Sequence, residues 1–215
     1  MKFNLAIFDF DGTVMDTSPG IFATANAAIE YLGLQPETDR SVLARFVGPP
    51  IRDSFVAVYN LEEALIDRAV ETYRVLYDEK GRFGAELYDG MLETLQALRA
   101  HGYKTAIATL KPEHLVKQMT DHFGLDGYFD SIRGSDPLHK TTKAAVMRHV
   151  LEDLKTDCQS SVLIGDTPHD EEGAKETGCS FIAAEWGFGF PKGHPGSSAT
   201  LAVAKRPLEL LKLLL

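Results

Sequence analysis

Short apolar runs alternate with longer amphipathic segments along most of this chain. Five runs rich in β-branched or aromatic residues predict strands: Leu5–Phe10, Thr105–Leu110, Tyr128–Arg133, Ser161–Gly165 and Ser180–Ala184. Between the last four runs, apolar residues recur at the spacing of one helix face. Strands that alternate with helices in this way indicate an α/β fold, with a Rossmann-like three-layer core and a mainly parallel sheet.

The interval between the first two predicted strands breaks this rhythm, because it is far longer than a crossover needs. Its apolar pattern predicts helices over Ile21–Leu32, Arg40–Phe46, Arg52–Tyr59 and Leu61–Lys80. We therefore expect a core domain of residues 1–15 and 86–215 and an inserted α-helical cap subdomain of residues 16–85. A cap that begins directly after the first strand would lie over the strand ends and act as a lid. The alternative is a helical bundle without a catalytic role.

Composition narrows the class of partner. The chain of 215 residues has a formal net charge of −9 and no basic tract, which argues against a nucleic acid polymer or an anionic membrane. Its two cysteines, Cys158 and Cys179, are too few for a disulfide framework. The first apolar run is short and contains Asp9, so it resembles neither a signal peptide nor a membrane span. These features predict a cytoplasmic protein.

The first predicted strand ends in two carboxylates, within Asp9-Phe10-Asp11-Gly12-Thr13. Side chains alternate along a strand, so Asp9 and Asp11 should leave it on the same side. Two like charges are unfavourable there unless a cation holds them or one carries a proton. A solvated Asp-Gly turn would explain Asp11, but not an acid at Asp9 between two phenylalanines. The pattern therefore favours a functional site.

Polar residues also follow three other predicted strands: Thr109 and Lys111, then Lys140 and Lys143, then Asp166 and Asp170. The carboxyl ends of parallel strands meet at one edge of a sheet, so these side chains should converge with Asp9 and Asp11. A set of oxygen ligands without His or Cys suits a hard cation, most plausibly Mg²⁺.

The residues quoted so far resemble a known family. Asp9-Phe10-Asp11-Gly12-Thr13, Thr109, Lys143 and the run Gly165–Asp170 look like the four signature motifs of the haloacid dehalogenase (HAD) superfamily, in the right order. The helical insertion resembles that superfamily's first type of cap. Gly48-Pro49-Pro50 and Trp186-Gly187-Phe188-Gly189 resemble its phosphoglycolate phosphatase-like branch.

This resemblance implies roles for the matching residues. Asp9 would be the nucleophile that forms an aspartyl-phosphate, and Asp11 would protonate the leaving oxygen and then activate water. Thr109 and Lys143 would hold the phosphoryl oxygens, with Lys140 as the fallback for the lysine. In the alternative without a catalytic role, Thr109 would be a strand-end hydroxyl that caps the next segment.

The same resemblance implies a Mg²⁺ site. Asp9 and Asp166 would bind the ion directly, Asp11 through its backbone carbonyl, and Asp170 would support it through water or hydrogen bonds. For Asp170, an ordinary acid at a helix start is the alternative. In the cap, Arg52 is a candidate for reading an anionic substrate, with a solvated arginine as an equal alternative.

The predicted function is a Mg²⁺-dependent phosphatase that hydrolyses a small phosphorylated metabolite, with phosphoglycolate as the substrate that the branch suggests. A 5'-nucleotidase or pyrophosphatase of the same fold, and a phosphomutase, are the enzyme alternatives. A receiver-type domain or another non-catalytic phospho-binding protein is the alternative from a different class. The chain is expected to be a monomer or homodimer.

Overall fold

A computed structural model describes residues 3–136, 141–198 and 200–215. The chain divides into two compact units, Met1–Met15 with Leu87–Leu215, and Asp16–Glu86. Where the chain passes between them, β2 (Met15–Asp16) pairs with β3 (Glu86–Leu87). The second unit is therefore an insertion into the first.

The larger unit is built on a six-stranded sheet, with strand order β5-β4-β1-β6-β7-β8. The strands are β1 (Leu5–Phe8), β4 (Lys104–Pro112), β5 (Ser131–Ser135), β6 (Ser161–Gly165), β7 (Ser180–Ala184) and β8 (Thr200–Ala204). Each neighbouring pair is parallel. From the central β1, the chain adds strands first on one side and later on the other, so the strand order reverses at β1.

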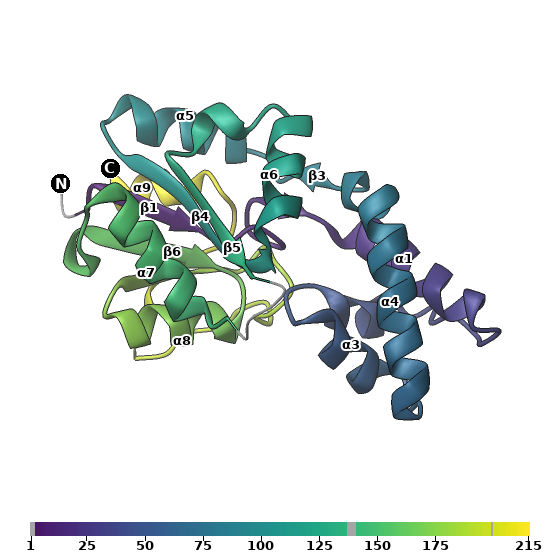
Figure 1. Ribbon diagram of the computed structural model, residues 1–215. Helices are drawn as coiled ribbons and strands as arrows, with labels where there is room; N and C mark the ends of the chain where they lie inside the picture. Colours follow the sequence, from purple (N-terminus) through teal and green to yellow (C-terminus); the bar gives the residue numbers. More distant parts are fainter. Residues whose placement is uncertain (1–2, 137–140, 199) are drawn as a thin grey trace. The chain divides into compact units, whose positions relative to one another are not determined.

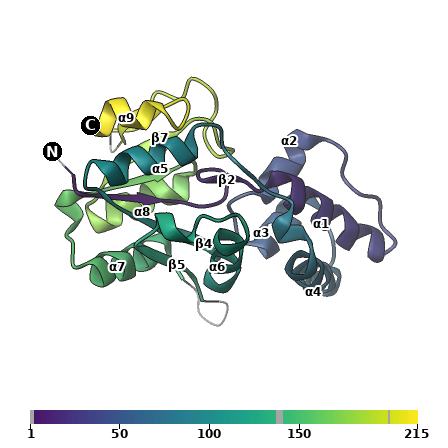
Figure 2. The ribbon, with the colours of Figure 1, turned by 90° about the horizontal axis from the view of Figure 1, so that it is seen from above.

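Helices cover both faces of this sheet, as Figures 1 and 2 show. They are α5 (Met91–Ala100), α6 (Glu113–His122), α7 (Lys143–Leu154), α8 (Pro168–Thr177) and α9 (Glu209–Leu214). Against α7 and α8, alternate residues of the strands, such as Leu5, Ile7 and Leu163, form a buried apolar cluster with Val146 and Met147 of α7. This period-two alternation is what a strand in a covered sheet requires.

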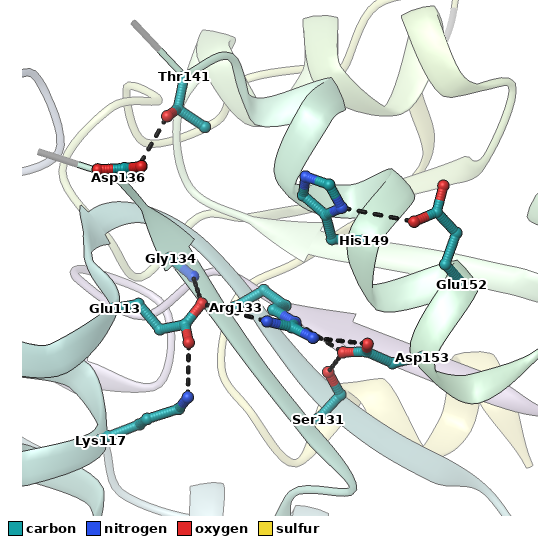
Figure 3. Close-up of polar contacts among 10 residues, drawn as sticks. All are labelled: Glu113, Lys117, Ser131, Arg133, Gly134, Asp136, Thr141, His149, Glu152 and Asp153. Atoms are coloured by element: carbon teal, nitrogen blue, oxygen red, sulfur yellow. Dashed lines mark hydrogen bonds and ion pairs between the residues drawn. The ribbon is translucent and has the colours of Figure 1, made fainter. Parts of the chain in front are cut away.

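The edge strand β5 is tied to α7 by a charged network (Figure 3). The Arg133 guanidinium donates to both carboxylate oxygens of Asp153, at 2.7 Å each, and the Ser131 hydroxyl donates to Asp153 Oδ2 at 2.7 Å. Bidentate arginine–carboxylate pairs fix geometry as well as adding energy. The network therefore fixes the position of β5 relative to α7.

The inserted unit is helical and has its own core. It contains α1 (Ser18–Tyr31), α2 (Arg40–Leu43), α3 (Ile51–Val58) and α4 (Glu63–Glu79). The buried ring of Phe55 contacts those of Phe46 and Tyr73 edge to face. Tyr73 in turn stacks on Tyr77, with the ring centroids 5.2 Å apart. Aromatic rings bury large apolar areas, so this cluster gives a short bundle enough core to stay compact.

Two strand predictions need correction. The first strand ends at Phe8 rather than Phe10, although the Asp9 amide still donates to the Ile164 carbonyl at 2.9 Å. The predicted strand Tyr128–Arg133 was wrong at its start, because Asp126–Tyr128 is a 3-10 turn closed by a bond from the Tyr128 amide to Leu125. The sixth strand, Thr200–Ala204, was not predicted: it is a short, partly exposed strand at the edge of the sheet.

The expected fold class agrees with the structure. The sheet is parallel and helices cover both of its faces, as the alternation of patterns predicted. Among the helices in the described ranges, none combines the length and the apolar character that crossing a membrane would need.

Candidate active site

The site lies just beyond the carboxyl ends of the central strands. Asp9 follows β1 directly, and Asp166 follows β6 directly. Because β1 and β6 are neighbours in register, with Phe8 opposite Ile164, both carboxylates leave the sheet at the same edge. This edge is also where the strand order reverses, the usual position for ligands in such sheets.

Lys143 links two of the acids. It is the first residue of α7, and its ammonium group donates to Asp9 Oδ1 at 2.6 Å and lies 2.5 Å from Asp170 Oδ1. All three side chains are buried. A Cβ at Gly173 of α8 would lie 2.6 Å from Lys143 Cγ, so this glycine makes room for the lysine stem. Burial alone would lower the pKa of Lys143, but Asp170 and Asp9 outweigh it and raise that pKa.

Asp170 is held by the start of its own helix. Thr167 caps α8, its amide and hydroxyl donating to Asp170 Oδ2 at 2.9 and 2.6 Å. This reciprocal capping box fixes the Asp170 side chain toward Lys143. The alternative of an ordinary acid at a helix start is thus half right, because Asp170 both caps α8 and faces the buried lysine.

Asp166 is bound by neutral donors instead. The Thr13 hydroxyl donates to Asp166 Oδ1 at 3.0 Å, and the Phe188 amide donates to Asp166 Oδ2 at 2.8 Å. A Cβ at Gly12 would lie 2.4 Å from Asp166 Oδ2, and one at Gly187 would lie 2.3 Å from Asp166 Cβ. Glycine at both positions therefore lets the backbone close around this carboxylate.

The arrangement fits a divalent cation. Asp9, Asp166 and Asp170 each offer a carboxylate oxygen within 4.8 Å of the others. Burial, opposed by Lys143, raises the pKa of Asp9 to about 6, and burial together with Asp170 and Asp9 raises the pKa of Asp166 to about 8. A cation would relieve this unfavourable crowding of negative charge, and three oxygen donors suit Mg²⁺. The side chain of Asp11 is not in this group.

Asp11 has a partner of its own. Lys111 Nζ donates to both carboxylate oxygens of Asp11, at 3.1 and 3.2 Å. Nearby, the buried Thr109 hydroxyl accepts a hydrogen bond from the Lys111 amide at 3.3 Å, as the capping alternative expects. The same hydroxyl keeps its own proton as a donor, so this bond leaves open the predicted role in binding phosphate.

The remaining predicted residues are Arg52 and Lys140. Arg52 belongs to the inserted helical unit, where it pairs with Asp67 and, at 3.1 Å, with Glu63 of α4. Lys140, the fallback for the phosphate lysine, lies outside the described residues.

Two contacts of the site were not predicted. The Phe188 amide is a backbone donor, and backbone donors leave no signal in residue type. Trp186 Nε1 donates to the Thr13 carbonyl at 3.0 Å and so anchors the turn after β1. The repeated glycines of Trp186-Gly187-Phe188-Gly189 were the available signal, since they allow the close approach to Asp166.

Comparisons with known proteins decide the family. The model of the haloacid dehalogenase-like hydrolase family matches residues 6–184. The chain belongs to this family. The predicted HAD-like fold and the predicted enzyme class, a phosphatase, are therefore confirmed.

Individual relatives carry several names. A 5'-nucleotidase of Pseudomonas aeruginosa is 33% identical, over 88% of this chain and 86% of its own. A phosphoglycolate phosphatase of Aquifex aeolicus is 30% identical, over 85% and 84%. The tyrosine-protein kinase PtkA of Mycobacterium tuberculosis is 32% identical over 86% of this chain, which spans 63% of that protein. The crystal structure of a predicted phosphatase from Clostridium acetobutylicum superposes with a TM-score of 0.88 at 34% identity, covering 99% and 98%.

Proposed function

We propose that this protein is a Mg²⁺-dependent phosphatase that hydrolyses a small phosphomonoester through an aspartyl-phosphate on Asp9. The observation that carries the proposal is the buried cluster of Asp9, Asp166 and Asp170 around Lys143 at the carboxyl edge of the sheet. Buried carboxylates are costly unless they bind cations, and this cluster has more acids than ammonium groups to offset them. Such an imbalance supports a site that receives a metal ion.

In the first half-reaction, a carboxylate oxygen of Asp9 attacks phosphorus and forms a new P–O bond. The bond between phosphorus and the leaving oxygen breaks, and the proton that this oxygen needs comes from the carboxyl group of Asp11. Lys143 of α7 and the Thr109 hydroxyl of β4 would offset charge on the phosphoryl oxygens.

In the second half-reaction, water attacks phosphorus and gives a proton to the Asp11 carboxylate. The P–O bond to Asp9 breaks, so phosphate leaves and both aspartates return to their starting state. A bound Mg²⁺ would reduce the repulsion between the Asp9 carboxylate and the anionic phosphoryl group. Asp9, Asp166 and Asp170 would hold it, with the backbone carbonyl of Asp11 as a further ligand.

The substrate is proposed from the relatives and from the inserted unit. Phosphoglycolate, a nucleoside monophosphate and pyrophosphate are the candidates, because each corresponds to the name of a relative. The helical unit Asp16–Glu86 enters the chain right after the Asp9–Asp11 turn, so we propose that it selects the substrate as a lid, with Arg52 as one recognition residue. The working form is a cytoplasmic monomer or homodimer.

The test is release of inorganic phosphate from a panel of phosphorylated metabolites, with Mg²⁺ and with EDTA. The panel contains phosphoglycolate, a nucleoside monophosphate, pyrophosphate, a hexose phosphate and p-nitrophenyl phosphate. We expect Mg²⁺-dependent hydrolysis that Asp9→Asn abolishes and Asp11→Asn reduces by about 10²-fold or more. Hydrolysis by the Asp9→Asn variant would refute the covalent route. Conversion of the hexose phosphate to an isomer without phosphate release would instead indicate a phosphomutase.

A further inference from the structure

Lys111 is a buried lysine that the proposed mechanism does not use. Its side chain is 5% exposed, that of its partner Asp11 is 11% exposed, and the two residues lie 100 positions apart in the chain. The ammonium group lies between the two carboxylate oxygens, at 3.1 and 3.2 Å. A buried lysine needs a specific partner to offset its dehydration, so this contact is a built feature of the site rather than a surface ion pair.

The local backbone explains how Lys111 reaches Asp11. Between β4 and β5, Ala108 lies opposite Arg133 and Pro112 lies opposite Ser135, so β4 advances four residues while β5 advances two. Such a bulge changes the direction of the side chains within it, here those of Thr109 to Lys111. Without the bulge, side chains from Thr109 to Lys111 would follow the regular alternation of the strand.

Gly134 of β5 allows this bulge. A Cβ at Gly134 would lie 2.5 Å from the Lys111 carbonyl oxygen and 2.6 Å from Glu113 Cα, so only glycine fits there. Its amide donates to Glu113 Oε2 at 3.3 Å, and Glu113 in turn binds Lys117 (Figure 3). The segment that carries Lys111 therefore lies against Gly134 of β5 through contacts that do not involve Asp11.

We propose that Lys111 is a positioning residue that acts through Asp11, a conclusion that rests on the proposed function. An ammonium group that faces both oxygens of a carboxylate restricts its rotation. Asp11 must present an oxygen first to the leaving group and then to water, and misplacement of a reacting group by about 1 Å costs about 10²-fold in rate. Lys111 and Lys143 would thus divide the work: Lys143 faces Asp9 and Asp170, whereas Lys111 orients the proton carrier.

A double-mutant cycle tests the inference. The measured quantity is the rate of inorganic phosphate release from an alkyl phosphate, whose leaving oxygen needs the proton of Asp11, by excess enzyme in a single turnover, for wild type, Lys111→Met, Asp11→Asn and the double variant. If Lys111 acts through Asp11, Lys111→Met changes the rate of the Asp11→Asn enzyme by less than about twofold. If it lowers both rates by the same factor, Lys111 acts on the substrate directly and the inference fails.

The leaving group supplies a second readout that a merely structural residue would not move. p-Nitrophenolate leaves without a proton, whereas an alkoxide needs one from Asp11. Lys111→Met should therefore lower kcat/KM for an alkyl phosphate about 10-fold or more beyond its effect on p-nitrophenyl phosphate. Equal losses on both substrates would overturn the inference. The control is Lys175→Met, an exposed lysine on α8, which should leave both values unchanged.

The variants distinguish failure of this inference from misfolding and from failure of the proposed function. Lys111→Met leaves the buried Asp11 carboxylate without its ammonium partner, and Asp11→Asn leaves the buried Lys111 ammonium group without its carboxylate, whereas the double variant removes both charges. If Lys111→Met fails to fold, the comparison of Asp11→Asn with the double variant still tests the inference. Hydrolysis by Asp9→Asn would refute the proposed function. An inactive Asp9→Asn enzyme together with multiplicative losses in the cycle would refute the role of Lys111 alone.

Discussion

Replacing Lys143 by methionine should destabilise the metal-free protein strongly. The ammonium group lies 2.6 Å from Asp9 Oδ1 and 2.5 Å from Asp170 Oδ1, and all three side chains are buried. At an effective dielectric constant of about 20, each contact contributes about 6 kcal/mol of attraction, most of which offsets the dehydration of the charges. Removing one partner of a buried ion pair typically costs about 3–5 kcal/mol, which is the expected loss at pH 8 in EDTA.

The assay is guanidinium unfolding followed by the fluorescence of Trp186, the chain's single tryptophan. Trp186 belongs to the larger unit and binds the Thr13 carbonyl there, so its signal reports on the unit that contains Lys143. The loss should shrink at pH 5, because Asp9, whose pKa is already raised to about 6 by burial, then takes up a proton. Mg²⁺ should restore part of the stability at pH 8.

The matched control is Lys117→Met, whose ammonium group is exposed and pairs only along its own helix. We expect this control to cost about 0.5 kcal/mol or less. A loss below about 1 kcal/mol for Lys143→Met at pH 8 in EDTA would refute the view that Lys143 compensates the buried acids. So would a loss that does not depend on pH.

Three further predictions concern other parts of the chain. The Arg133 guanidinium lowers the pKa of Asp153 to about 2, so the stability that Asp153 adds at neutral pH should vanish as pH falls from about 4 to 2. Unfolding of Asp153→Asn should differ from wild type by about 1 kcal/mol at pH 7, since the pair is partly exposed, and a difference that persists at pH 2 would contradict this. Gly187→Ala, whose Cβ would lie 2.3 Å from that of Asp166, should raise the Mg²⁺ concentration for half-maximal activity at least about tenfold, and an unchanged Mg²⁺ titration would count against the proposed ligand. Arg52→Ala should cost less than about 1 kcal/mol in thermal unfolding yet alter the ranking of metabolite substrates while sparing p-nitrophenyl phosphate; equal losses on every substrate would make Arg52 a structural residue.

Much of the fold could be predicted because it depends on local patterns. The four inner strands bury both faces, so their sequences are short apolar runs bounded by turns, and they were found to within a few residues. The edge strand Thr200–Ala204 escaped because one of its sides has no neighbouring strand and its residues are partly exposed. The predicted strand began too early, at Tyr128, because an aromatic residue in a 3-10 turn cannot be distinguished by residue type from one in a strand.

The types of group at the site were readable from the sequence for a similar reason. Carboxylates, a hydroxyl and lysines stand directly after apolar runs, and strand ends of a parallel sheet meet at one edge whatever their distance in the chain. Asp9, Asp166 and Lys143 are accordingly within one buried cluster.

Which lysine faces which acid depends on tertiary structure. Lys111 and Lys143 both come after an apolar run in the sequence and carry the same charge, so residue type cannot distinguish them. A bulge in β4 directs Lys111 to Asp11, and the first turn of α7, beside Gly173, directs Lys143 to Asp9 and Asp170. The amide of Phe188 is likewise invisible in sequence, because every residue except proline carries one. Apolar spacing along the chain determined where strands end and which chemical groups follow them, whereas the pairing of those groups was decided by backbone irregularities and close approaches that involve only a few ångströms.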